Sequence, residues 1–178
     1  MINWPETIPT LSDGNLSLRA WQSSDVNFVY DSCQDPDILE FTTVPAPYTQ
    51  NDAREFIESR IHLFNAKKYI PFAGVVDGEL AMSVSLHDII YFDHVCEVGY
   101  WVNPRFRGQG LAKRAVDLIT NYGFSIGFRR IQGYVLPENL GSQKVLLGAG
   151  FELEASLANC LTRRDGTQSA GLVFARTA

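Results

Sequence analysis

A chain of 178 residues, 46% hydrophobic and 20% charged, has the length and composition of one globular domain, expected to span residues 1–178. Its formal net charge of −5 argues against a general nucleic-acid-binding protein, because such proteins are usually basic. No apolar stretch is long enough to cross a membrane, and residues 1–9 lack the pattern of a signal peptide. The three scattered cysteines favour reduced thiols over a disulfide framework or a zinc site, so we expect a cytoplasmic protein without a metal.

Five elements are predicted in the first half of the chain. They are a strand over 16–20, a short helix over 24–32, a turn over 36–41, a helix from 50 to about 67, and a hairpin formed by 69–76 and 79–86. Thr49 is a good N-cap for the long helix, with Asp52 in its first turn. The dipeptide Asp77-Gly78 is typical of a tight hairpin turn, so the two strands beside it should pair directly.

The second half of the chain alternates strands and helices before a final hairpin. A loop over 87–94 precedes a strand over 95–102, a helix after a glycine-containing turn, a strand over 131–135, a helix over 140–147, and two strands joined by the turn 163–166. In the first of these helices Leu111, Ala115 and Ile119 recur at helical spacing. Because only this part alternates strand and helix, the sheet should be mixed, with its parallel part around 95–135.

The most informative segment is the turn between the strand over 95–102 and the next helix. Asn103-Pro104 ends the strand, and Arg107-Gly108-Gln109-Gly110 precedes the helix. Glycine lets the backbone approach a ligand closely, and the first N–H groups of a helix have no partner within it. With the positive end of the helix dipole behind them, these groups predict a cradle for a pyrophosphate.

The turn does not fit a dinucleotide site or a nucleoside-triphosphate site. A dinucleotide fingerprint needs a third glycine where Lys113 stands and an acidic residue at the end of the next strand, and the chain has neither. A triphosphate loop needs Gly-Lys-Ser/Thr after its glycines, which is also missing. The remaining alternative from the residues alone is a strand-to-helix turn that uses glycine only for its geometry.

Residues 107–112, Arg-Gly-Gln-Gly-Leu-Ala, fit the pattern Arg/Gln-x-x-Gly-x-Gly/Ala and resemble the GCN5-related N-acetyltransferase (GNAT) superfamily, which binds acyl-coenzyme A. Asn139-Leu-Gly-Ser142 and Gly148-Ala-Gly-Phe151 follow in the superfamily's order, and Glu97-Val-Gly-Tyr-Trp101 resembles the RimJ/RimL group of ribosomal-protein N-terminal acetyltransferases. The resemblance covers about 16–174. It implies a single-domain α/β fold with a mixed, mostly antiparallel seven-stranded sheet, a central parallel pair splayed apart for acyl-CoA, and helices on both faces.

The resemblance also implies which residues hold acetyl-CoA, the expected co-substrate. The pantetheine arm would pair with the edge of the strand over 95–102, at Tyr100, Trp101 and Val102. The pyrophosphate would be held by backbone N–H groups of the turn, with an added contact from the Arg107 side chain. The residues of this turn are Arg107, Gly108, Gln109, Gly110, Leu111 and Ala112. Asn139 would contact the pantetheine arm and Ser142 would lie near the sulfur, although helix capping alone also explains both residues.

Glu97 is the candidate general base, acting through a water on the incoming ammonium. Strand alternation puts Glu97, Gly99 and Trp101 on one face and Cys96 and Val98 on the other. The second set should be core under a helix, so Cys96 is expected to be a buried residue rather than an acyl-carrying nucleophile. Glu97 then faces the other way, with open space over the glycine beside it. The alternative is a carboxylate paired with an arginine or exposed on the sheet.

Ser142 is the candidate general acid for the leaving thiolate. Many superfamily members have a tyrosine just after this helix in that role, whereas the last tyrosine of this chain is Tyr134. Ser142 or a water must then supply the proton, or the chemistry is impaired. The histidines and aspartates of the segment 87–94 are interpreted as solvated loop residues rather than metal ligands.

The prediction is direct transfer of an acetyl group from acetyl-CoA to a primary amine in a ternary complex. The resembled group implies that the acceptor is the N-terminal α-amine of a protein, such as a ribosomal protein. Two alternatives remain: a small-molecule amine (a polyamine, amino acid or antibiotic) as acceptor, and a non-catalytic acyl-CoA-binding module. We expect a monomer or a homodimer that binds neither nucleic acid nor a membrane.

Overall fold

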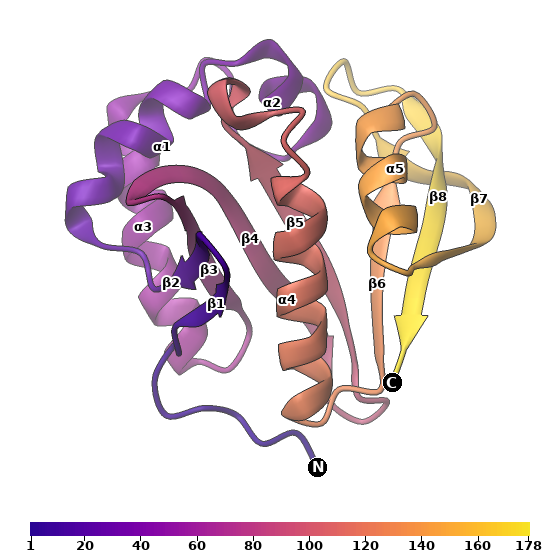
Figure 1. Cartoon of the computed structure of the whole chain (residues 1–178). Coiled ribbons are helices and arrows are strands. Elements are labelled where there is room, and N and C mark those ends of the chain that lie inside the picture. Colours follow the sequence, from indigo (N-terminus) through magenta and orange to yellow (C-terminus); the bar gives the residue numbers. More distant parts are fainter.

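The computed structural model describes residues 1–178 and contains one eight-stranded sheet surrounded by helices (Figure 1). In chain order the elements are β1 (Leu11–Asp13), β2 (Leu16–Arg19), the 3-10 helix η1 (Ser23–Asp25), α1 (Val26–Ser32), α2 (Pro36–Phe41), α3 (Gln50–Asn65), β3 (Ile70–Val76), β4 (Glu79–Ile90), β5 (Val95–Val102), the 3-10 helix η2 (Pro104–Phe106), α4 (Leu111–Ser125), β6 (Arg130–Val135), α5 (Leu140–Gly148), β7 (Glu152–Thr162) and β8 (Gln168–Thr177). The strands lie in the order β1-β2-β3-β4-β5-β6-β8-β7, and only β5 and β6 are parallel. The expected mixed, mostly antiparallel fold is confirmed.

The sheet has eight strands where seven were expected. The extra strand is β1, which pairs with β2 across the turn that begins at Asp13. A strand of three residues is too short for its alternation to be recognised in the sequence. The segment 36–41 differs too, because it is a helix rather than a turn. Asp35 is its N-cap, accepting a hydrogen bond from the Ile38 N–H at 3.0 Å, and Pro36 occupies its first position.

The strand β4 is longer than predicted. It continues to Ile90, so half of the loop expected over 87–94 is strand, and His87 pairs with Glu97 on β5. The register shifts between His87 and Ile90, where Asp88 has a φ of 47°. This irregularity hides the strand from a simple alternation pattern. The extension therefore places a histidine beside the predicted base, which the sequence analysis did not anticipate.

Local capping and turn chemistry explain the two clearest predictions. Thr49 and Asp52 form a reciprocal capping box at the start of α3. Asp77 and Gly78 have φ values of 49° and 87°, so both central residues of the hairpin turn are left-handed. Such turns twist in the same sense as the strands they join, which is why β3 and β4 pair directly.

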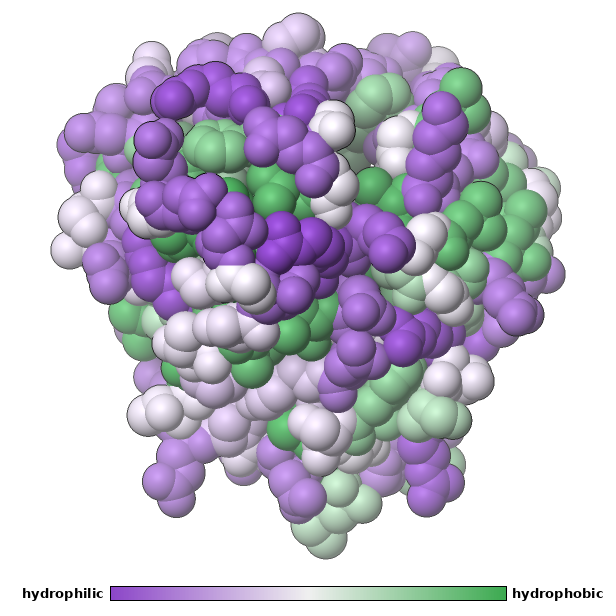
Figure 2. Space-filling view, viewed as in Figure 1, coloured by the Kyte–Doolittle hydropathy of each residue, from purple (hydrophilic) through white to green (hydrophobic).

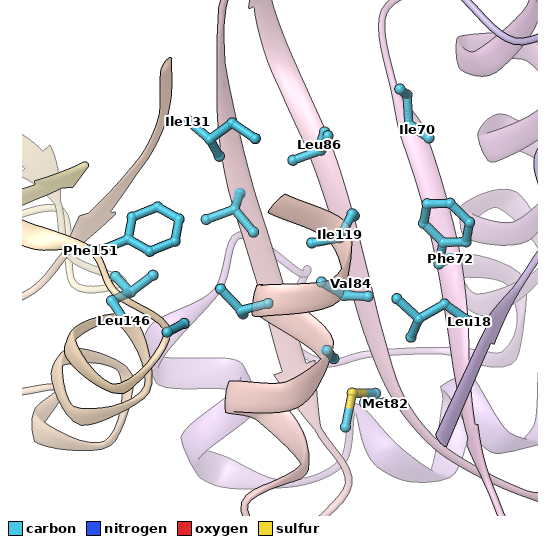
Figure 3. Close-up of a cluster of buried hydrophobic side chains, with 14 of the residues drawn as sticks. Leu18, Ile70, Phe72, Met82, Val84, Leu86, Ile119, Ile131, Leu146 and Phe151 are labelled. Carbon is cyan, nitrogen blue, oxygen red and sulfur yellow. The ribbon is translucent and has the colours of Figure 1, made fainter. Parts of the chain in front are cut away.

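Helices cover both faces of the sheet, and each face has its own core. On one face α4 and α5 pack against the sheet through Leu86, Ile119, Ile131, Leu146 and Phe151, whose side chains point toward one another in Figure 3. All five are less than 3% exposed, and burying a side chain of this size stabilises the fold by roughly 1.5–3 kcal/mol. On the other face α1 and α3 pack against the sheet through a smaller cluster that includes Trp21, Ile57 and Trp101.

The sheet opens between its two parallel strands. β5 and β6 pair at only three positions, from Val95 opposite Arg130 to Glu97 opposite Gln132. Beyond this point the two strands diverge toward the top of Figure 1, where the N-terminal end of α4 also lies. The part of β5 from Val98 to Val102 therefore pairs with β4 alone. Its other edge presents unpaired backbone groups to the gap.

The surface is polar over much of the view in Figure 2, with apolar side chains gathered at the right, where α5 and β7 lie. Among the exposed large apolar residues of these two elements are Leu140, Leu147, Leu153 and Leu157. β7 is also an edge strand of the sheet. None of the helices combines the length and the apolar character needed to span a bilayer.

Candidate active site

A groove of about 1600 Å³ lies where the sheet opens. Its lining includes the unpaired edge of β5 over 98–102 and residues 133–135 of β6. Residues 106–108 and 110–113 line it too, as do the first turns of α5 and the loop that follows α2. A smaller cavity of about 440 Å³ near η1 and α3 contains none of the predicted site residues. The groove therefore brings together the segments on which the sequence analysis placed the site.

The turn before α4 has the geometry of an anion cradle. Gly110 is the helix N-cap with a φ of 73°, and its carbonyl accepts the first intrahelical bond, from Arg114. The N–H groups of Leu111, Ala112 and Lys113 therefore have no partner in the helix. A Cβ atom at Gly108 or at Gly110 would meet nothing within 4 Å, so the space above the turn is open. The turn fits a pyrophosphate group.

Two side chains of the turn are engaged elsewhere. The Arg107 guanidinium pairs with Asp35, and with Asp37 at 2.9 Å, at the N-terminal end of α2. Its charge is thus shared with two carboxylates instead of being free for a ligand. The side-chain amide of Gln109 donates to the carbonyl oxygen of Arg105 at 3.3 Å. A ligand in the cradle would therefore meet backbone N–H groups first.

Asn139 and Ser142 begin α5 as a capping pair. Asn139 Oδ1 accepts a hydrogen bond from the Ser142 N–H at 3.0 Å, so the capping interpretation holds for Asn139. Ser142 Oγ lies 2.7 Å from the hydroxyl oxygen of Tyr100 on β5. Burial raises the pKa of Tyr100 to about 12, so its phenol keeps its proton at neutral pH. A tyrosine hydroxyl therefore reaches Ser142, but it comes from β5 and not from the segment after α5, where many superfamily members have a tyrosine.

Glu97 lies on the face predicted for it, opposite the buried Cys96. Burial, together with the neighbouring carboxylate of Asp88, raises the pKa of Glu97 to about 7. Burial raises the pKa of the Cys96 thiol well above its usual range, and the residue is fully buried in the core beneath α4. The expectation that Cys96 is a core residue is therefore confirmed.

The open space expected beside Glu97 is filled. A Cβ atom added at Gly99 would lie 2.6 Å from Nε2 of His87, so the imidazole occupies the volume that the glycine leaves. The ring also stacks on Tyr69, with centroids 5.3 Å apart. Trp101, two residues further along the same face, is 8% exposed and stacks on Phe28 of α1. Side chains of β4 and α1 thus lie over Gly99 and Trp101, while Glu97, Gly99 and Trp101 still border the groove.

The structure also groups His87 and Asp88 with Glu97, which lies in a separate segment of the sequence. The nitrogen and carboxylate atoms of these three residues lie within 4.8 Å of one another. The imidazole Nδ1 is 2.9 Å from Asp88 Oδ2. Their positions depend on the pairing of β4 with β5, so nothing in the sequence except the alternation of Ser83, Ser85 and His87 could have indicated them.

Comparison with known proteins gives matches over most of the chain. A family model described as an acetyltransferase (GNAT) domain matches residues 15–152. The chain is 26% identical over 151 residues to an uncharacterized N-acetyltransferase, YnaD, of Bacillus subtilis, covering 83% of this chain and 85% of that protein. It is 29% identical over 113 residues to a ribosomal-protein-serine acetyltransferase of Escherichia coli, covering 61% of this chain and 62% of the other.

Among solved structures, RimJ of Mycobacterium smegmatis in complex with CoA-disulfide superposes with a TM-score of 0.87. The two sequences are 24% identical, and the match covers 99% of this chain and 89% of RimJ. At this identity the superposition establishes a shared fold. The family match, by contrast, rests on the sequence of most of the chain.

Proposed function

Because this chain belongs to the acetyltransferase (GNAT) family and is an acetyl-CoA-dependent N-acetyltransferase, we propose that its acceptor is the α-amine at the N-terminus of a protein. The observation that carries the proposal is the size of the groove, about 1600 Å³. Pockets for small ligands usually measure about 300–1,000 Å³. The groove therefore has room for the pantetheine arm and pyrophosphate of the donor together with the first residues of an extended peptide.

The donor binds along the edge of β5 and at the turn before α4. The backbone groups of Tyr100 and the N–H of Val102 face the gap and hold the amides of the pantetheine arm as a neighbouring strand would. Trp101 lies between them with its own N–H and C=O turned toward β4, and the Val102 carbonyl accepts from Arg107 Nε at 3.3 Å. The pyrophosphate lies on the N–H groups at the start of α4, in the turn of residues 107–112. Asn139, whose Oδ1 caps α5, has its side-chain NH₂ group free to donate to the arm.

The acid and the base act from opposite faces of β5. Glu97 takes a proton from the incoming ammonium through a water, and its pKa of about 7 suits that task at neutral pH. Ser142 donates a proton to the sulfur as it leaves. The Tyr100 hydroxyl, 2.7 Å from Ser142 Oγ, can hydrogen-bond to the serine oxygen as it loses that proton. A nucleophile that arrives on one face and a leaving group that departs on the other need this separation.

The acceptor end of the groove is bordered by two segments that Arg164 joins. Arg164, in the turn between β7 and β8, donates to the carbonyl oxygens of Leu39 at 2.6 Å and Val44 at 2.7 Å. Thr42–Val44 and Leu161–Thr162 both line the groove. The acceptor peptide would lie against this joined border, with its α-amine directed to Glu97. A protein with an accessible, extended N-terminus, such as a ribosomal protein, would fit against this border.

A polyamine is the second candidate acceptor. The groove is lined by several carboxylates on the side of α2 and α3, namely Asp37, Glu40, Asp52 and Glu55, in addition to Asp88 and Glu97. Asp37 is paired with Arg107, and basic residues line the groove too, but the carboxylates that are not paired can hold a ligand with more than one positive charge. A peptide presents a single ammonium group at its N-terminus, whereas a polyamine presents several. The two candidate acceptors therefore differ in how many carboxylates of the groove would contact them.

The test is thiol release from acetyl-CoA with two sets of acceptors. One set is octapeptides that begin with serine or alanine, each compared with the same peptide carrying a blocked N-terminus. The other is spermidine. We expect turnover with free peptides, none with blocked peptides, and mass spectrometry showing acetyl on the N-terminal residue. Turnover with spermidine alone would replace the proposed acceptor by a polyamine, and acetylation of lysine side chains only would also contradict the proposal.

A further inference from the structure

The pairing of β4 with β5 puts His87 on the acceptor face of the site, next to the point where the strands separate. Glu97 is the last residue of β5 that pairs with β6, and Gly99 is the first residue of the unpaired edge on the same face. The imidazole of His87 lies directly over Gly99, with Nε2 as the nearest atom. It thus occupies the acceptor side of the segment that would hold the thioester.

Asp88 determines which nitrogen of His87 is free. Asp88 Oδ2 lies 2.9 Å from Nδ1, so a neutral imidazole with its proton on Nδ1 donates to this carboxylate. The same tautomer leaves a lone pair on Nε2, above Gly99. An acidic residue that orients an imidazole in this way is the general arrangement of a histidine base. Tyr69 stacks on the ring and restricts its rotation.

Acetyl transfer to an amine requires two protons to leave the nitrogen. The acceptor begins as an ammonium ion, and one proton must leave before the lone pair can form the N–C bond. When that bond has formed and the C–S bond breaks, the nitrogen must lose a second proton to become a neutral amide. The sulfur takes one proton and the solvent takes the other. A single carboxylate would have to discharge its first proton before it could accept the second.

We propose that His87 is a second catalytic base of this enzyme: its Nε2 takes the proton that the acceptor nitrogen loses after the N–C bond forms, while Glu97 takes the earlier one. This inference rests on the proposed acetyl transfer to an amine. The His87 side chain is 23% exposed, so the imidazolium can pass its proton to solvent between turnovers. Gly99 is then a positioning residue, because any side chain there would displace the ring.

The experiment compares His87→Ala and His87→Gln with the wild-type protein and with His62→Ala, in thiol release with the serine octapeptide. His62 is an exposed histidine of α3 that does not line the groove, so it is the matched control. We expect both His87 variants to lose about 100-fold in kcat, within the usual range for general base catalysis, with CoA affinity changed less than twofold. Asp88→Asn, whose side chain tolerates the positive φ of this position, should lose less.

The decisive readout is chemical rescue. His87→Ala leaves a space over Gly99 beside the Tyr69 ring, and added imidazole should restore turnover there. A series of substituted imidazoles of similar size should rescue in the order of their basicity, which a purely structural role of the ring would not produce. His62→Ala should show neither a loss nor a rescue.

If both His87 variants turned over as fast as the wild-type protein, or if no imidazole restored the lost turnover, the role of His87 would be overturned. The proposed function would then still stand. Absence of turnover by the wild-type protein with every peptide and with spermidine would overturn the proposed function, and the role of His87 with it. The wild-type arm therefore separates the two failures.

Discussion

The hydroxyl oxygens of Tyr100 and Ser142 lie 2.7 Å apart, although one residue belongs to β5 and the other to α5. The Tyr100 hydroxyl also lies 3.2 Å from the carbonyl oxygen of Ser142. The phenol keeps its proton because burial raises its pKa to about 12. The pair can therefore supply one proton to a leaving thiolate at the start of α5.

Ser142→Ala should lower kcat by about 10- to 100-fold, because the proton donor nearest the proposed position of the sulfur is lost. Tyr100→Phe should have a smaller effect in the same direction. CoA affinity, measured by calorimetry, should stay within about threefold of wild type in both. Ser125→Ala, at the far end of α4, is the control. Unchanged turnover in Ser142→Ala would exclude Ser142 as the acid.

Glu97→Gln should remove the part of the pH–rate profile that depends on the carboxylate. A base works in its deprotonated form, so kcat/KM of the wild-type enzyme should rise with pH through about 7, the pKa of Glu97. The variant should turn over more slowly and lose this rise. Glu154→Gln is a control of the same charge change at an exposed carboxylate on β7. A profile of the same shape in Glu97→Gln would exclude Glu97 as the base.

The same variant should change stability in a pH-dependent way. The pKa of Glu97 is raised from 4.5 to about 7 in the folded protein, so the folded state holds its proton at pH values where the unfolded state has released it. Burial of the carboxylate therefore destabilises the fold fully above about pH 7 and not at all below about 4.5. Glu97→Gln should melt higher than wild type at pH 8 and equally at pH 4.5, measured by calorimetry. A constant difference across this range would contradict the assignment.

Gly110→Leu should abolish detectable CoA binding. Gly110 has a φ of 73° and lies where the pyrophosphate would approach the protein backbone. A side chain there would therefore both strain the turn and fill the cradle. Gly78→Leu carries a similar strain, with a φ of 87° in a hairpin turn that does not line the groove. The two variants should lose similar stability, while only the first loses CoA. Retained affinity in Gly110→Leu would refute the cradle.

Asp37→Asn should strengthen CoA binding. Asp37 pairs with Arg107 at 2.9 Å and is mostly exposed, so its carboxylate competes with a pyrophosphate for the guanidinium. Exposed ion pairs are worth about 0.2–1 kcal/mol, which corresponds to a gain of up to about fivefold in affinity. Asp93→Asn repeats the charge change away from the groove. A weaker affinity in Asp37→Asn would mean that Asp37 positions Arg107 for the ligand instead.

The sequence by itself determined the features that depend on neighbouring residues. The turn at 107–110, the capping box of Thr49 and Asp52 and the amphipathic pattern of α4 all specify their structure over a few residues. Most elements, though not β1 or α2, and the open turn before α4 could therefore be predicted directly. Alternation also placed Cys96 in the core and Glu97 on the opposite face, because that rule holds along any strand.

Only the tertiary structure decided which distant side chains meet. The irregular end of β4 determines that His87 stands over Gly99, and the divergence of β5 from β6 determines where backbone groups are left unpaired. The packing of α5 beside that opening brings Ser142 to Tyr100, and α2 draws the Arg107 side chain away from the turn. These contacts join residues up to 72 positions apart, and no local pattern records them because they depend on strand register and helix packing.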